Sequence, residues 1–318
     1  MRMPLSPVEA RTSSTQRGPV LTVAHRGASA YAPENTLAAV RCAVGHHADL
    51  VELDVQRSKD GALVLLHDTT LARTTNVRRL FPGRRPWLVS DFTYAEIRRL
   101  DAGSWRSDRF VGETVPTLTE AIEAVRTSGT GLLLELKAPA LYPGIVADLA
   151  STLRQVPAYL EAATTANRLI VESFDHGAMH DHKSLEPSVP VGLLGAPDTA
   201  RLARLAAWAD QVNPGHWTTD AAYVAAVRDA GMACLVWTVN RAAAMRRALR
   251  LGVDGVITDR PDLLRRQVAA HPAAAGHASA TKMQNGWPAG SAKTYSGSSS
   301  SSDRSSRTVA PSDVARSR

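Results

Sequence analysis

Short apolar runs recur along the chain, and segments with helical spacing separate most of them. Eight such runs lie between residues 20 and 258, and the segments between them are rich in Ala, several ending in a Gly that suits a helix C-terminus. Eight buried strands alternating with helices predict the α/β class and a (β/α)8 TIM-type barrel. The runs are VLTVA at 20, LVELDV at 50, GLLLEL at 131, RLIVES at 168, PVGLL at 190, DQVN at 210, MACLVW at 232 and DGVIT at 254, of which DQVN is the weakest strand.

The spacing between the second and third runs is longer than the others. About 75 residues lie between them, more than one crossover helix needs. We therefore expect a small insertion after the second strand, at about residues 68–116, where loops reach the active-site face of a barrel. Its basic turn VRRLFPGRRPW could cap an anionic substrate or touch a membrane, although such a turn is more often only solvated.

The two ends of the chain differ in composition from its body. Residues 1–19 are polar and without periodicity, and the chain from residue 271 onward is dominated by Ala, Gly and Ser. Such segments bury too little apolar surface to offset their chain entropy. We expect a flexible arm over 1–19, one barrel domain over 20–270 and a disordered Ser-rich tail over 271–318.

The net charge of +7 does not indicate a nucleic-acid-binding surface, because most of the excess lies in these ends. Three Arg stand against one Glu in residues 1–19, and six Lys or Arg stand against two Asp in residues 271–318, which leaves one excess positive charge for the barrel. We expect no nucleic-acid partner. No apolar run reaches the roughly 20 residues of a membrane helix, and the N-terminus lacks the apolar run of a signal peptide. We expect no stable membrane insertion and, by default, a cytoplasmic location.

Carboxylates stand in the second and third predicted strands with a spacing of two. Glu52 and Asp54 point to one face of their strand, and Glu135 and Lys137 repeat the pattern in the next. An apolar strand does not bury two carboxylates without a cation. The three carboxylates therefore predict an oxygen-rich site for Ca²⁺ or Mg²⁺. The alternative is that they form structural salt bridges with Arg26 and Lys137.

Two histidines end apolar segments of the same predicted barrel mouth. His25 follows the first strand, and His67 ends the short extended run LVLLHD. A histidine can donate or accept a proton near neutral pH, so the two together predict an acid–base pair. An acid, a base, a cation and basic side chains are what hydrolysis of a phosphodiester requires. The histidines of DHGAMHDH (His176, His180 and His182) lack an evident third ligand, and we expect a solvated turn and helix start there.

These residues lie in motifs that together resemble the glycerophosphodiester phosphodiesterase family. The resemblance covers about residues 20–268, and no motif residue is missing. Their joint occurrence in order is far more specific than any single motif. The motifs are AHRGASAYAPENTLAA, VELDVQRSKDGALVLLHDTTLARTTN, LLLELK, VESFD, CLVWTVN and GVDGVITDRPDLL.

The resemblance implies an enzyme that hydrolyses glycerophosphodiesters to an alcohol and sn-glycerol 3-phosphate with a divalent cation, often Ca²⁺ or Mg²⁺. It further implies that a neighbouring glycerol hydroxyl attacks phosphorus, that a cyclic phosphate forms, and that water then opens the ring. The residues that match the family's site are His25 and His67 as the catalytic pair, Glu52, Asp54 and Glu135 as metal ligands, Arg26 and Lys137 at the phosphate, Phe174 and Trp237 along the pocket, and Glu34 as a support of the His25 loop.

The sequence leaves five properties of the protein open: the preferred alcohol, the native metal, which histidine is the acid, the oligomeric state and the role of the tail. A lysophospholipase D or another phospholipid diesterase would need an exposed apolar rim, for which Leu80, Phe81 and Trp87 are the candidates. A phosphodiester-binding protein would keep the barrel without turnover, although the intact histidine pair argues against it.

Overall fold

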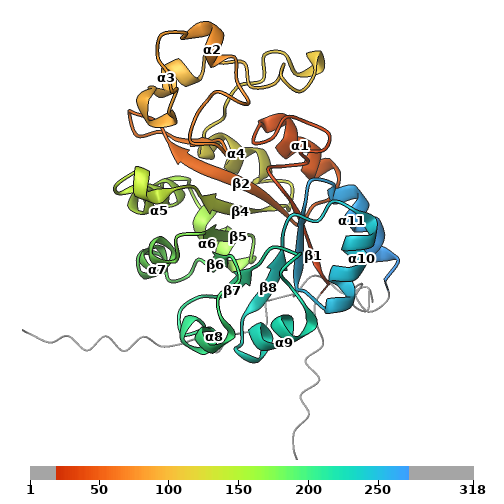
Figure 1. Ribbon diagram of the computed structural model, residues 1–318. Coiled ribbons are helices and arrows are strands. Elements are labelled where there is room, and N and C mark those ends of the chain that lie inside the picture. Colours follow the sequence, from red (N-terminus) through yellow and green to blue (C-terminus); the bar gives the residue numbers. More distant parts are fainter. Residues whose placement is uncertain (1–18, 272–318) are drawn as a thin grey trace, which may run out of the picture. The chain divides into compact units, whose positions relative to one another are not determined.

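The computed structural model describes residues 19–271, and these form a closed barrel of eight parallel strands. The strands follow the order β1-β9-β8-β7-β6-β5-β4-β2, and pairing of β1 with β2 closes the ring (Figure 1). Every strand expected from the apolar runs is present, DQVN included, so the predicted fold class is confirmed. Apart from residues 19 and 271, the expected arm and tail lie outside the described residues. The barrel strands are β1 (Leu21–Ala24), β2 (Leu50–Arg57), β4 (Gly131–Leu136), β5 (Leu169–Ser173), β6 (Val191–Leu194), β7 (Gln211–Asn213), β8 (Ala233–Val236) and β9 (Gly255–Thr258).

Helices connect the strands and cover the outside of the barrel (Figure 1). Several begin at a side chain that satisfies free backbone N–H groups: the Thr36 hydroxyl accepts from the Ala39 N–H, and Thr117 and Glu120 form a reciprocal capping box. In the part of the chain that the structure describes, no helix has the length and apolar character to cross a membrane. The helices are α1 (Leu37–Gly45), α4 (Leu118–Val125), α5 (Ile145–Gln155), α6 (Tyr159–Thr165), α7 (His176–Leu185), α8 (Thr199–Leu205), α9 (Ala221–Asp229), α10 (Ala242–Leu251) and α11 (Pro261–Ala269).

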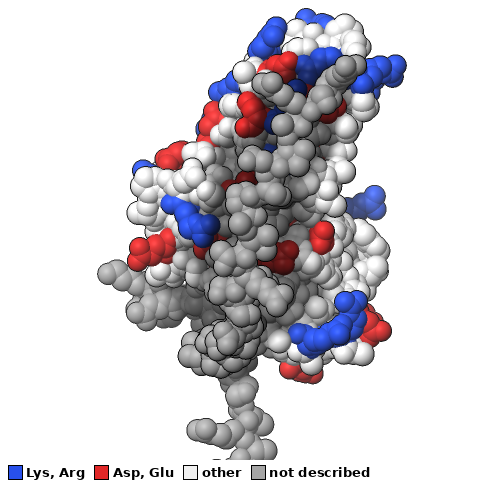
Figure 2. Space-filling view, turned by 90° about the vertical axis from the view of Figure 1, so that its left-hand side faces the viewer, with Lys and Arg blue, Asp and Glu red and all other residues white. Residues whose placement is uncertain are grey.

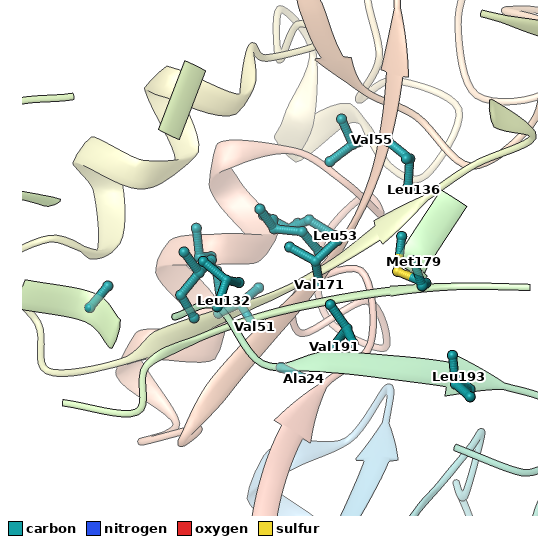
Figure 3. Close-up of a cluster of buried hydrophobic side chains, with 14 of the residues drawn as sticks. Ala24, Val51, Leu53, Val55, Leu132, Leu136, Val171, Met179, Val191 and Leu193 are labelled. Atoms are coloured by element: carbon teal, nitrogen blue, oxygen red, sulfur yellow. The ribbon is translucent and has the colours of Figure 1, made fainter. Parts of the chain in front are cut away.

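The main hydrophobic core lies between the strands and these helices. On β2, Val51, Leu53 and Val55 belong to this core, together with side chains of β4, β5 and β6 (Figure 3). Because side chains alternate along a strand, the residues between them, Glu52 and Asp54, point into the barrel. The strand pattern therefore turns the carboxylates inward while it anchors β2 to the helices.

The segment after β2 forms a small unit with its own core. The strand β3 (Leu63–Leu65) pairs antiparallel with the end of β2, and a second hydrophobic cluster lies mainly in residues 66–115. Trp87 belongs to this cluster and is only 6% exposed, and Phe81 packs edge-on against Phe92. Of the three residues considered for an apolar rim, only Leu80 is exposed. The elements of this unit are α2 (Val77–Leu80), α3 (Tyr94–Ile97) and the 3₁₀ turns Val89–Asp91 and Asp108–Phe110.

Basic side chains gather on the surface of this unit. Figure 2 shows Lys and Arg at the upper end of the view, the level at which Figure 1 places α2 and α3. Exposed arginines include Arg78, Arg79 and Arg85, from the turn that the sequence singled out as basic. This exposure is common to a solvated turn and to one that contacts a substrate or a membrane, so the interpretation of the basic turn stays a prediction.

Candidate active site

Three carboxylates meet inside the barrel at the carboxyl ends of β2 and β4. One carboxylate oxygen from each of Glu52, Asp54 and Glu135 lies within 4.8 Å of the other two. Their meeting follows from the sheet register, because Asp54 and Glu135 are Cα partners in neighbouring parallel strands. The spacing of two within β2 adds Glu52 on the same inward face.

Two basic side chains contact this cluster. Lys137 Nζ lies 2.7 Å from Glu135 Oε1 and 3.5 Å from Asp54 Oδ1. Arg26 Nε lies 3.4 Å from Asp54 Oδ2, and the Arg26 backbone N–H donates to Glu52 Oε2 at 2.6 Å. The salt bridges considered as the alternative from the sequence are therefore present.

A fourth carboxylate, Glu172, lies beside the three and was missed by the sequence analysis. It is the Cα partner of Glu135 across β4 and β5, it is buried, and Asn213 Nδ2 donates a hydrogen bond to it. Burial, with the charge of Glu135 second, raises the pKa of Glu172 to about 8. Its signal in the sequence was the alternation in LIVES, which turns Glu172 to the same face as Phe174.

The carboxylates outnumber the cations that neutralise them. Burial and the charge of Asp54 raise the pKa of Glu52 well above its ordinary value, and the same two causes raise that of Glu135 to about 7. Glu52 Oε1 and Asp54 Oδ1 are buried and have no hydrogen-bond partner among the described residues. Buried carboxylate oxygens that accept no hydrogen bond, on more carboxylates than Arg26 and Lys137 can neutralise, fit a hard divalent cation that takes oxygen ligands.

His25 stands at the end of β1 with its ring held by a carboxylate. Its Nδ1 lies 2.7 Å from Asp259 Oδ1, and Asn240 Nδ2 donates to Asp259 Oδ2 at 2.6 Å. The turn after His25 approaches α1 closely: Gly27 has a φ of 80°, and a Cβ there would lie 2.6 Å from the Ala39 Cβ. With Nδ1 engaged, Nε2 is the ring nitrogen available for proton transfer.

His67 follows β3 and has a carboxylate partner of its own. Its Nδ1 lies 2.8 Å from Asp68 Oδ1, and Arg73 donates to both oxygens of Asp68 at 2.7 and 3.0 Å. The hydrogen bonds from Arg73 lower the pKa of Asp68 to about 2. Burial lowers the pKa of His67 itself. Both expected catalytic histidines therefore have the same arrangement, an imidazole with Nδ1 against an aspartate.

Glu34 connects the two histidine loops. It accepts hydrogen bonds from Arg26 Nη1 at 2.9 Å and from Arg73 Nη1 and Nη2 at 2.8 and 2.7 Å. Arg26 is the neighbour of His25, and Arg73 holds the aspartate beside His67. We therefore expect Glu34 to support the His67 loop as well as the His25 loop.

Aromatic rings line the opposite part of the mouth. Phe174 follows β5 and Trp237 follows β8, and their ring centroids lie 5.7 Å apart. A third ring, Trp217 from the loop after β7, lies 5.3 Å from Trp237 and was not singled out from the sequence. Its loop, NPGHWTTD, follows the weakest predicted strand and has no local pattern that indicates a site.

The histidines of α7 take no part in this site. His176 Nε2 bonds to the Leu194 carbonyl, His180 packs edge-on against Trp208, and His182 is buried without a hydrogen bond for either ring nitrogen among the described residues. The helix start is as expected, but His182 belongs to the core rather than to a solvated turn.

Comparison with known proteins identifies the family. The model of the glycerophosphoryl diester phosphodiesterase family matches residues 25–263, most of the chain. The chain belongs to this family. It is therefore an enzyme of the phosphoric diester hydrolases, and every residue of the site just described lies within the matched range.

Relatives of the chain carry the same designation over nearly their full lengths. The glycerophosphodiester phosphodiesterase of Caldanaerobacter subterraneus subsp. tengcongensis is 36% identical over 249 residues, 77% of this chain and 96% of the relative. That of Bacillus subtilis is 35% identical over 275 residues, 81% of this chain and 90% of the relative.

A solved structure of the family also superimposes on the barrel. It is an Oleispira antarctica phosphodiesterase in complex with the product sn-glycerol-3-phosphate, 31% identical, with a TM-score of 0.68 over 79% of this chain and 97% of that one.

Proposed function

We propose that the chain hydrolyses glycerophosphodiesters to an alcohol and sn-glycerol 3-phosphate, with a divalent cation and with His25 and His67 as acid and base. The observation that carries the proposal is the joint arrangement at one mouth: two imidazoles, each against an aspartate, beside a cluster of buried carboxylates. Residues 20–270 are proposed as the catalytic domain.

Glu52, Asp54 and Glu135 would hold the cation through carboxylate oxygens, which favours Ca²⁺ or Mg²⁺ over softer metals. When bound, such a cation supplies positive charge that stabilises an anionic phosphoryl oxygen or a deprotonated hydroxyl. Arg26 and Lys137 contact the cluster and present cationic donors to the remaining phosphate oxygens. Phe174 and Trp237 would line the pocket beside them.

The histidines carry the protons in both halves of the reaction. One accepts the proton of the glycerol hydroxyl that attacks phosphorus, and the other donates a proton to the departing alcohol, which leaves a cyclic phosphate. In the second half the roles reverse: a water proton is accepted, and the ring oxygen that leaves phosphorus is protonated. Each positioned transfer contributes about 10²- to 10⁴-fold in rate.

The test is release of sn-glycerol 3-phosphate from glycerophosphocholine and glycerophosphoethanolamine with Ca²⁺, with Mg²⁺ and with chelator. We expect metal-dependent release in the wild type and loss of at least about 10²-fold in His25→Ala and in His67→Ala. Cleavage of lysophospholipids without cleavage of either diester would replace this proposal with the phospholipid diesterase. Binding without turnover of any diester would indicate a binding protein.

A further inference from the structure

Three aromatic rings at the barrel mouth, Phe174, Trp217 and Trp237, form what we call the aromatic wall. They follow β5, β7 and β8, and the carboxyl ends of parallel barrel strands lie at one rim, the rim of His25 and the carboxylates. Phe174 is 56% exposed and Trp217 is 64% exposed. Large aromatic side chains with this exposure beside an active site are candidates for ligand contact.

The rings of the wall stand at right angles to one another. Phe174 and Trp237 make an interplanar angle of 89°, and Trp217 and Trp237 make one of 87°. Perpendicular rings form corners in which a compact group can contact the faces of more than one ring.

The backbone holds the tryptophans in place. Trp237 Nε1 donates to the Asn213 carbonyl at 2.8 Å, and the His216 N–H donates to the Trp237 carbonyl at 2.9 Å. The Trp217 ring lies against Gly215, where a Cβ would come within 2.7 Å of it. Because the rings are already held in place, their side chains lose little conformational entropy when a ligand binds.

The wall also differs from the aromatic cluster of the unit after β3, because no cation of the protein lies over its rings. In the unit after β3, Arg78 and Arg85 lie over the Trp87 ring, and Arg84 lies over Phe92. Within residues 19–271 no Lys or Arg is found over Phe174, Trp217 or Trp237. The ring faces are left for a cation from outside the protein. Burial and the charge of Arg247 lower the pKa of the neighbouring His216, which disfavours its charged form.

We propose that the aromatic wall binds the quaternary ammonium of a choline-bearing diester, with Trp217 as the residue that determines this specificity. The inference rests on the proposed function and adds the substrate class to it. A quaternary ammonium has no N–H to donate, so it binds to aromatic faces through cation–π attraction rather than through hydrogen bonds. The choline group can come from glycerophosphocholine or from lysophosphatidylcholine, and the experiment separates these two sources.

The experiment compares glycerophosphocholine with its neutral isostere, the 3,3-dimethylbutyl ester of glycerol phosphate. The two diesters have nearly the same shape but differ in the acidity of the departing alcohol as well as in charge. This intrinsic difference is the same in every variant, so the change in the ratio of their kcat/KM values between the wild type and a Trp217 variant measures what Trp217 contributes to recognition of the ammonium. Release of sn-glycerol 3-phosphate is measured for the wild type, for Trp217→Leu and for Trp217→Phe, which keeps an aromatic face. Choline release from lysophosphatidylcholine is measured in parallel.

We expect the ratio to fall by a factor between about 2 and about 30 from the wild type to Trp217→Leu, the range of cation–π attraction from exposed to desolvated sites. In Trp217→Phe, which keeps an aromatic face, the ratio should fall less. Trp217-dependent cleavage of lysophosphatidylcholine in place of glycerophosphocholine would support the ammonium site and assign it to the lysolipid.

A ratio that Trp217→Leu leaves unchanged would overturn the inference while the proposed function stands, and so would cleavage of glycerophosphoethanolamine with no cleavage of either choline diester. No product from glycerophosphoethanolamine or from any of these diesters would overturn the proposed function, and the inference with it.

Discussion

The hydrogen bond between Asp259 and His25 makes a prediction for the substitution Asp259→Asn. The orientation of Asn240 is fixed, because its Oδ1 accepts from the Asp259 N–H at 2.9 Å and from the Thr258 hydroxyl at 3.1 Å. Its Nδ2 must therefore face residue 259, as it faces Asp259 Oδ2 in this structure. An asparagine at 259 would keep its oxygen toward Asn240 and turn its NH₂ group toward His25. His25 Nδ1 would then have to accept a hydrogen bond, and the ring proton would move to Nε2.

The expected decrease in kcat/KM has two causes, the loss of the hydrogen bond between His25 and the charged Asp259 and the loss of the proton acceptor at His25 Nε2. A hydrogen bond to a charged group contributes about 1.5–3 kcal/mol, which corresponds to about 10- to 150-fold in rate. The inverted tautomer removes the proton acceptor at Nε2 as well, so the total should lie between about 10²- and 10⁴-fold in kcat/KM. Most of the loss should fall on kcat, since Asp259 contacts neither Arg26 nor Lys137 in this structure.

The assay is the steady-state release of sn-glycerol 3-phosphate as a function of pH. Asp262→Asn is the matched control, because Asp262 lies three residues further on and bonds to Tyr31 rather than to a histidine. The kcat/KM of the control should stay within about 2-fold of the wild type, because Asp262 bonds to Tyr31 and Arg266 and, among the described residues, to no histidine or carboxylate of the site. An Asp259→Asn enzyme with more than a tenth of the wild-type kcat/KM and the same pH profile would refute the reasoning.

Three further predictions concern the cation and the core. Saturation with Ca²⁺ or Mg²⁺ at about 100 times its Kd should stabilise the protein by about 2.7 kcal/mol and raise Tm by about 5–10 °C, and calorimetry should find this shift abolished in Glu52→Gln. Burial, with Lys183 and Arg154 second and third, lowers the pKa of His182 to about 4 from 6.5. The folded protein therefore binds fewer protons than the unfolded chain between these values, so stability should fall by about 3 kcal/mol as pH drops from 6.5 to 4, and urea titrations of His182→Leu should show a smaller fall. Leu134 on β4 is fully buried against the helices, so Leu134→Ala should lower the free energy of unfolding by about 2–5 kcal/mol. In the same urea titration Leu141→Ala, at an exposed position, should lower it by less than about 0.5 kcal/mol.

Alternation along the strands made the fold and the carboxylate cluster predictable. Glu52, Asp54 and Glu135 interrupt apolar runs at a period of two, and this period identifies the face that turns into the barrel. Glu172 follows the same rule in LIVES, but it has no second polar residue two positions away, which is what drew attention to the other carboxylates. The register places Glu172 beside Glu135 and so adds to the excess of carboxylates over cations.

The contacts of the other site residues could not be predicted from the sequence, although Asp259 and Asn240 lie in motifs of the family resemblance. Asp259 lies 234 positions from His25, and it is closure of the barrel that brings the two together. Asn240 acts through Asp259, and Trp217 lies in a loop whose path depends on Gly215 and on the bond from His216 to Trp237. Contacts of this kind depend on the tertiary arrangement of elements and leave no periodic signal along the chain.

The pairing of β1 with β9 also determines when, during synthesis and folding, the enzyme can become active. β1 forms four register pairs with β9 but only two with β2, so the strand that precedes His25 is held mainly by the last of the barrel strands to leave the ribosome. The nascent chain lacks the partner of His25 until Asp259 has been translated and β9 has docked. Pairing across so many residues is slow to form, because a long loop must close first. Enzymatic activity should therefore return late and in a single phase during refolding, after most of the circular dichroism signal of the helices has returned.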